Sequence, residues 1–200
     1  MAAWKVTSYS RRVTTASGAL ARACGAVGDL IADVGPNQWM APTPCTEWNV
    51  RDVVNHVVAM NLVFAAMIGD GPMPERGADH LSNDPVAAYQ ASTASLEGAF
   101  ARPGVLERSY AGPLGSATGA ERLQIRLYDL LTHGWDLAQA TGRPAQIPDE
   151  LAEQALAFVR NQLSTQPRTG RFAEPQPIDG TAPALDRLAA FLGRTVLPPR

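Results

Sequence analysis

The segment spanning residues 50–68 constrains the fold of this chain more than any other part of its sequence. Its large apolar residues cover nearly every side of the helix that their spacing predicts: Val53, Val54, Val57, Val58, Met60, Leu62, Val63, Phe64, Met67 and Ile68. A helix that is apolar all round lies in the interior of a protein. Asn49 can cap its first turn, and Asp52 places an acid in that turn. The rest of the chain is therefore expected to pack around this helix.

Five further segments carry the apolar period of amphipathic helices. They span residues 13–34, 85–100, 118–140, 149–163 and 182–192. We expect residues 1–12 to form a lead-in segment and residues 13–200 to form a single domain, because 200 residues with 46% hydrophobic content can bury one ample core. Long helices with hardly any strand signal predict an all-α bundle.

Charge and composition exclude several classes of protein. A net charge of -2 gives no basic field for a phosphate backbone, so no nucleic-acid partner is expected. Polar residues interrupt every long apolar run, and no apolar stretch follows the basic residues near the N-terminus, so we expect neither a membrane span nor a signal peptide. Cys24 and Cys45 are too few to form a disulfide framework, which agrees with a cytoplasmic protein. A monomer and a homodimer are both compatible with the sequence.

Three residues with metal-ligating side chains lie within the apolar helical segments. His56 occurs in the central segment, where an unpaired imidazole is costly, and Asp129 and His133 are four residues apart, on one face of the predicted fourth helix. Two histidines and a carboxylate can hold a divalent ion with a coordination position left open. A hydrogen-bonded core histidine and a weak helical ion pair explain the same residues without a metal.

Other polar residues near these segments are candidates for supporting roles. Asp136 can orient an imidazole of the site or can simply be a polar residue late in the helix, and Tyr128 and Arg126 are adjacent candidates for an acid or a base. Arg168 and Arg171, in the Pro- and Gly-rich loop before the last helix, can bind a carboxylate of a substrate or can simply be solvated. The catalytic residues themselves stay unassigned at this point.

Three motifs carry a resemblance to a known family. They are PTPCTEWNVRDVVNH at residues 42–56, DLLTHGWDLAQATG at residues 129–142 and LDRLAAFLGR at residues 185–194. In this order they resemble the DinB-like metal-binding proteins related to the N-terminal domain of mycothiol-dependent maleylpyruvate isomerase. The resemblance implies an up-and-down four-helix bundle with additional short C-terminal helices. It also implies a divalent metal, often zinc, held by His56, Asp129 and His133.

The resemblance further implies a small-molecule chemistry. A low-molecular-weight thiol such as mycothiol would use the open metal position and attack an electrophilic substrate, giving isomerisation or S-transfer. A metal-dependent hydrolase and a non-catalytic, stress-related metal-binding bundle remain the alternatives. The same ligand set also occurs in non-haem iron oxygenases, but those usually have a β-scaffold.

Overall fold

The computed structural model describes residues 3–112, 115–168 and 170–196, with side chains from residue 17 onward. The elements in this part are α1 (Ala3–Ala32), α2 (Val50–Gly69), α3 (Pro85–Phe100), β1 (Ser109–Tyr110), β2 (Ala117–Thr118), α4 (Gly119–Thr141), α5 (Asp149–Leu163) and α6 (Ala184–Phe191). The two short strands pair antiparallel, with Ser109 opposite Thr118. The predicted all-α bundle with additional short C-terminal helices is confirmed.

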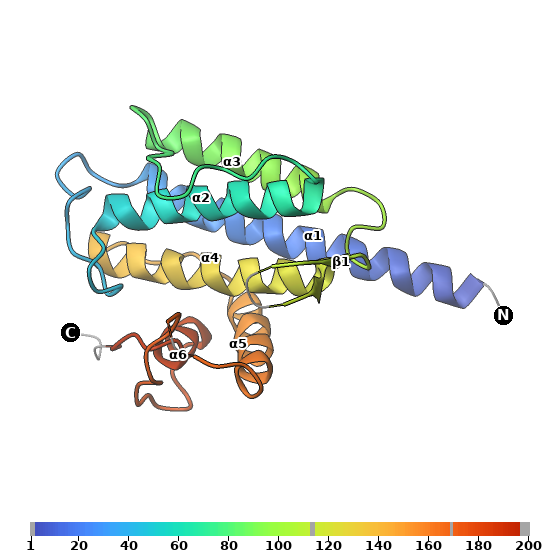
Figure 1. Cartoon of the computed structure of the whole chain (residues 1–200). Helices are drawn as coiled ribbons and strands as arrows, with labels where there is room; N and C mark the ends of the chain where they lie inside the picture. Colours follow the sequence, from blue (N-terminus) through green and yellow to red (C-terminus); the bar gives the residue numbers. More distant parts are fainter. Residues whose placement is uncertain (1–2, 113–114, 169, 197–200) are drawn as a thin grey trace.

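Helices α1 to α4 form the bundle, and α5 and α6 lie outside it against α4 (Figure 1). Both α1 and α2 pack against α3 and α4. Helix α4 therefore contacts two bundle helices on one side and the C-terminal helices on the other. This position places α4 between the core and the segment that follows it.

The directions of the helices alternate less strictly than a simple up-and-down bundle implies, because α2 and α3 run in the same direction. The loop of residues 70–84 returns along α2 and makes this possible (Figure 1). Asn55 pins the loop: its side-chain amide donates to the Ala78 carbonyl at 3.1 Å and accepts from the His80 backbone N–H at 2.8 Å. The loop therefore packs along one side of α2.

Capping residues set the boundaries of the two helices that carry the candidate ligands. At the start of α2, Asn49 and Asp52 form a reciprocal capping box, and Thr118 and Glu121 form another at the start of α4. Helix α4 ends at Gly142, which has a φ of 69°. The predicted starts of these two helices are confirmed. They could be predicted because a capping residue acts on the backbone of its own first turn.

Helix α1 begins at Ala3, so residues 3–12 of the expected lead-in segment are helical. No proline or glycine occurs in residues 3–12, and adding a residue to an existing helix is far easier than starting one. The helix that forms on the bundle therefore continues toward the N-terminus.

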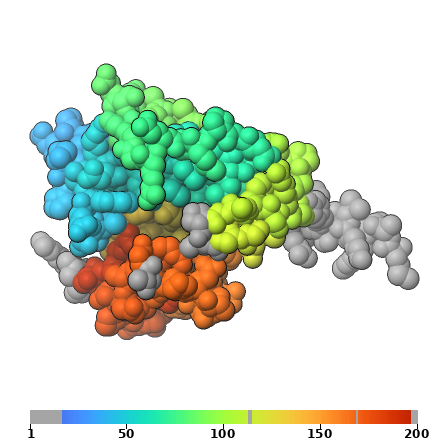
Figure 2. Space-filling view, viewed as in Figure 1, coloured from blue at the N-terminus to red at the C-terminus, as the bar shows by residue number. Residues whose placement is uncertain are grey.

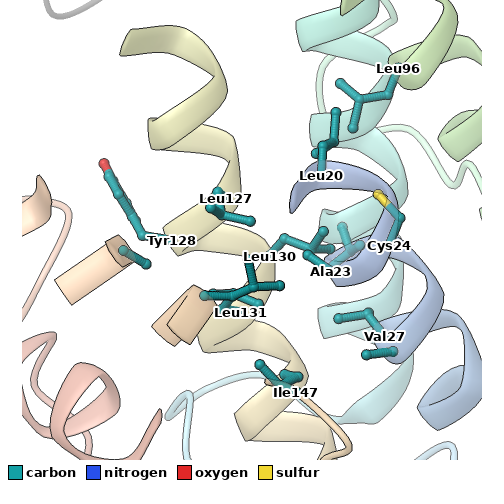
Figure 3. Packing of buried hydrophobic residues seen from close by; sticks show 14 of the residues in the cluster. Leu20, Ala23, Cys24, Val27, Leu96, Leu127, Tyr128, Leu130, Leu131 and Ile147 are labelled. Atoms are coloured by element: carbon teal, nitrogen blue, oxygen red, sulfur yellow. The ribbon is translucent and has the colours of Figure 1, made fainter. Parts of the chain in front are cut away.

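The core lies between α4 and the other bundle helices. Leu127 and Leu130 of α4 point toward Ala23 and Val27 of α1, whereas the Tyr128 hydroxyl points to the other side of α4 (Figure 3). One face of α4 thus packs in the core. The candidate ligands Asp129 and His133 lie on the neighbouring face of the helix.

In the described part of the chain, α2 is the one helix long and apolar enough to cross a membrane, by length and composition alone. Core helices of proteins that never enter a membrane pass the same test, so this is weak evidence. The expectation that no membrane is involved stays a prediction.

We predict that Gly119→Ala strongly destabilises the protein, because the start of α4 packs directly against the chain before it. A Cβ at residue 119 would lie 2.0 Å from the Val105 carbonyl oxygen, a backbone atom that cannot turn away. The expected loss in the free energy of unfolding is at least about 2 kcal/mol, measured by chemical denaturation.

Gly98→Ala is the matched control, since residue 98 is exposed on α3 and its Cβ would meet nothing within 4 Å. This change should leave stability unaltered or raise it by about 0.5–1 kcal/mol. Equal stability of the two variants would contradict the described packing at the start of α4.

Candidate metal centre

The structure brings the three candidate ligands together from two antiparallel helices. His56 lies on α2, and Asp129 and His133 lie one turn apart on α4. Asp129 Oδ1 is 3.4 Å from His56 Nε2 and 3.6 Å from His133 Nε2, and the ligand atoms all lie within 4.8 Å of one another. Tetrahedral zinc with bonds of about 2.0–2.1 Å separates its ligand atoms by about 3.3–3.4 Å. The donor set and its spacing therefore fit a divalent ion.

His133 is held in the orientation that a ligand needs. Its Nδ1–H can donate to Asp136 Oδ2 at 3.0 Å, which directs Nε2 toward Asp129. Burial lowers the pKa of His133, against the opposing effect of Asp136, and so favours the neutral imidazole. A neutral imidazole leaves the Nε2 lone pair free for a metal.

Arg194 completes this arrangement from beyond α6. Its Nη2 donates to Asp136 Oδ2 at 2.9 Å and its Nε donates to Oδ1 at 3.2 Å. Burial opposes ionisation of Asp136, but the hydrogen bonds from His133 and Arg194 hold the pKa of this carboxyl below its ordinary value. Asp136, which has no exposed surface, is thereby kept as an anion.

Asp129 is kept in its ionised form by the basic side chains around it. Burial alone would raise its pKa, but His56, His133 and Arg126 together lower the pKa well below the ordinary value. Arg126 Nη1 donates to Asp129 Oδ2, which leaves Oδ1 facing the two imidazoles. The side chain thus presents one oxygen to the candidate site.

Trp48 and Cys45 close the site beside the histidines. The Trp48 ring centroid lies 4.8 Å from that of His56 and 5.7 Å from that of His133. Cys45, His133 and Asp136 form a second group of potential ligands within 4.8 Å of one another. This group fits a metal less well, because Asp136 is already paired with Arg194 and burial raises the pKa of the Cys45 thiol.

A cavity of about 690 Å³ opens from the three candidate ligands. Figure 2 shows a hollow between α2 and the C-terminal segment, with α4 at its base. Tyr128 and Arg171 line the cavity, as predicted for residues near the site. This volume is within the ordinary range for a small-molecule site.

Arg168 lies away from the cavity in this structure. It does not line the cavity, and its guanidinium donates to the backbone carbonyls of Ala173 and Phe191 and so holds the loop against α6. Binding of a substrate by Arg168 stays a prediction that this placement does not support. Of the two arginines, Arg171 alone has access to the cavity.

Comparison with known proteins places the chain in a family. A model described as the mycothiol maleylpyruvate isomerase N-terminal domain matches residues 20–138. Two uncharacterized proteins of Mycobacterium tuberculosis, from two strains, are each 40% identical to this chain over 177 residues, which is 88% of this chain and 95% of the relative. This chain belongs to the mycothiol maleylpyruvate isomerase N-terminal domain family. The family predicted from the three motifs is confirmed.

Solved structures show that the fold is shared. Two crystal structures of mycothiol-dependent maleylpyruvate isomerase, one of a histidine-to-alanine mutant, match with TM-scores of 0.57 and 0.63 at 15% and 14% identity. Each match covers 82% of this chain and 73% of the other. At such low identity the likeness concerns the fold alone.

The part matched by the family model contains every candidate ligand but not the whole site. His56, Asp129, His133 and Asp136 lie within residues 20–138, whereas Arg194 and the cavity residues of the loop before α6 lie outside it. Sequence reasoning missed the role of Arg194 because 58 residues separate it from Asp136. The one sequence signal was its place at the end of the third family motif.

We predict that Arg194→Gln lowers zinc affinity, because the Asp136 carboxylate would lose the partner that holds it against His133. Loss of such a supporting contact typically costs 10- to 100-fold in metal affinity, about the drop expected here. The measurement is competition with a chromophoric chelator. In an Asp136→Asn background, Arg194→Gln should cause no further loss, since Arg194 acts through Asp136.

Asp186→Ala is the matched control. Asp186 accepts a hydrogen bond from Trp135 Nε1 at 2.7 Å and so ties the same C-terminal segment to α4 at the adjacent residue. Alanine removes this acceptor without touching Asp136 and should leave zinc affinity within about twofold, a change near the size of RT. Equal losses in Arg194→Gln and Asp186→Ala would show that Arg194 merely stabilises the fold.

Proposed function

We propose that this protein is a divalent-metal-dependent enzyme that uses a low-molecular-weight thiol, such as mycothiol, to isomerise or S-conjugate a small electrophile. Membership of the family supports a mycothiol-dependent, isomerase-like function. The use of a metal is supported by the three-ligand group at the end of a cavity open to small molecules. Zinc is the ion that this donor set suits best.

The ion and the protein side chains would have separate tasks. When bound by His56, Asp129 and His133, a divalent cation supplies a positive charge that favours the nucleophilic thiolate over the thiol. Asp136 and Arg194 hold the His133 ring in place, and Trp48 packs over both imidazoles. The site is thus shaped before a substrate arrives, which reduces the reorganisation needed for reaction.

The chemistry proposed for the electrophile is addition followed by elimination. The thiolate sulfur forms a bond to one alkene carbon of a conjugated carbonyl compound, and the alkene electron pair moves to the carbonyl oxygen. Rotation about the former double bond, return of the electron pair and loss of the same thiolate give the isomer with no net change in atoms. In S-conjugation, the adduct takes up a proton instead and is released.

Tyr128 is our candidate to stabilise the developing negative charge on the carbonyl oxygen. It is almost fully buried, lines the cavity and has its hydroxyl pointing away from the core (Figure 3). Burial raises the pKa of Tyr128 well above its ordinary value, so the hydroxyl keeps its proton and can donate a hydrogen bond. A hydrogen-bond donor suits this role better than a base does.

The proposal also covers the domain organisation, the location and the partners of the protein. We propose one domain from the bundle through α6, a cytoplasmic protein, and a monomer or homodimer without nucleic-acid or membrane partners. The low net charge supports the exclusion of nucleic acid.

The proposed function predicts that a thiol enters the metal coordination sphere. In the cobalt-substituted protein, titration with mycothiol should produce a sulfur-to-metal charge-transfer band, and turnover of an electrophile should depend on added thiol. His56→Ala combined with His133→Ala should abolish both cobalt binding and the band. His80→Ala is the matched control, because His80 does not line the cavity.

Two outcomes would contradict this proposal. Turnover in the absence of thiol would favour a hydrolase that uses a metal-activated water. Absence of the band at saturating mycothiol or cysteine, with cobalt present at one ion per chain, would favour the non-catalytic metal-binding bundle.

A further inference from the structure

The cavity has two ends with different chemistry. At the end near the candidate ligands the lining includes the polar side chains of Thr46, Glu47, Thr132 and Arg194, together with the Trp48 ring. Apolar side chains line the far end, which we call the distal lobe: Met60, Val63, Phe64, Met67 and Ile125. The difference follows from the sequence, because His56 is the last polar residue on the cavity side of α2 before Met60, Val63 and Met67.

The antiparallel arrangement of α2 and α4 gives the distal lobe its length. Asp129 lies beside His56 at one end, and Arg122 of α4 lines the cavity at the other. Seven residues separate Asp129 from Arg122, which corresponds to about 10 Å of helix axis. A chain of several methylene groups or an aromatic ring with a short substituent fits this length.

The side chains that define the distal lobe are all apolar, and a single charged residue of the described lining, Arg122, lies at its far end. Arg122 donates from Nη2 to the Tyr110 carbonyl at 2.9 Å and to the Gly115 carbonyl at 2.7 Å, whereas its buried Nε has no partner among the described residues. Asn61, on the same helix as Met60, is fully buried and accepts from Arg126. A polar group placed between Met60 and Ile125, before it reaches Arg122, would therefore lose its water without a side-chain partner, which is costly.

We propose that the distal lobe binds the apolar body of the electrophile, so that the substrates are compounds with an extended alkyl or aryl group attached to the reactive carbon system. This inference rests on the proposed function for the identity of the occupant. The thiol, whose polar groups need partners, takes the polar end beside Thr46, Glu47 and Arg194. The lobe and the candidate ligands are continuous, so the electrophilic carbon lies next to the position of the thiol sulfur.

The test is binding of N-alkylsuccinimides to the full chain as purified, measured by calorimetry, with the alkyl group lengthened from methyl to hexyl. These imides are saturated and cannot alkylate Cys45 or a thiol. Burial of each additional methylene should tighten binding by about fourfold until the lobe is filled. Val63→Gln and Ile125→Gln, both at half-buried positions, should reduce this gain to less than about twofold per methylene.

Val86→Gln is the matched control, because Val86 is a half-buried valine on α3 that does not line the cavity. It should retain the full dependence on chain length. No dependence in the unmodified protein, or the same dependence in Val63→Gln and Ile125→Gln, would overturn the proposal. So would a dependence on chain length in alkyl esters of N-acetylcysteine but not in the imides, because the thiol would then occupy the lobe.

These measurements separate the two proposals. Binding of the imides requires neither turnover nor thiol. Chain-length dependence without any thiol-dependent reaction would support the apolar binding site and contradict the proposed function. Thiol-dependent turnover without chain-length dependence would support the proposed function and contradict the apolar binding site.

Discussion

The buried guanidinium of Arg126 is the interaction on which the candidate site depends. This side chain has no exposed surface, and an unpaired charge there would be very costly. Its Nη2 donates to the Val57 carbonyl at 3.1 Å and to Asn61 Oδ1 at 2.7 Å, both on α2, while its Nη1 donates to Asp129 on its own helix. These bonds permit one register of α2 against α4. In that register His56, next to Val57, faces Asp129 and His133.

A second set of contacts ties the site to the C-terminal segment. Trp135 and Asp136 are adjacent on α4, and each is bonded to a residue of the segment that begins with α6: Trp135 to Asp186 and Asp136 to Arg194. The second tie reaches the candidate metal ligand His133 through Asp136. The family model ends at residue 138, so the support for His133 comes from outside the matched domain. The segment after α5 is thus part of the site as well as of the fold.

Much of the fold could be predicted from the sequence because its signals are local. The capping residues Asn49 and Thr118 mark the starts of α2 and α4, and the spacing of Asp129 and His133 places both on one helix face. The parallel course of α2 and α3 could not be predicted, because it depends on contacts of Asn55 with a loop more than 20 residues away. The extension of α1 to Ala3 could not be predicted either, because it depends on growth of a helix already formed on the bundle rather than on a signal within residues 3–12.

For the candidate site, too, the local features could be predicted and the distant contacts could not. The ligand types and their helices were visible in the sequence, whereas the partners that orient them were not. Arg168 and Arg171 look alike in the sequence, yet the structure places Arg171 at the cavity and uses Arg168 to hold backbone carbonyls. A difference of three positions in a loop sets which arginine reaches the cavity, and no local pattern encodes it.

A single divalent ion held by His56, Asp129 and His133 can be tested directly in a crystal structure of the zinc-loaded protein, with anomalous diffraction recorded at the zinc edge. We expect one strong peak at about 2.0–2.2 Å from His56 Nε2, Asp129 Oδ1 and His133 Nε2. An ion bound instead by Cys45 and Asp136, with His56 and Asp129 not among its ligands, would contradict the assignment of the site. So would the absence of a peak among these residues in protein that contains one zinc ion per chain.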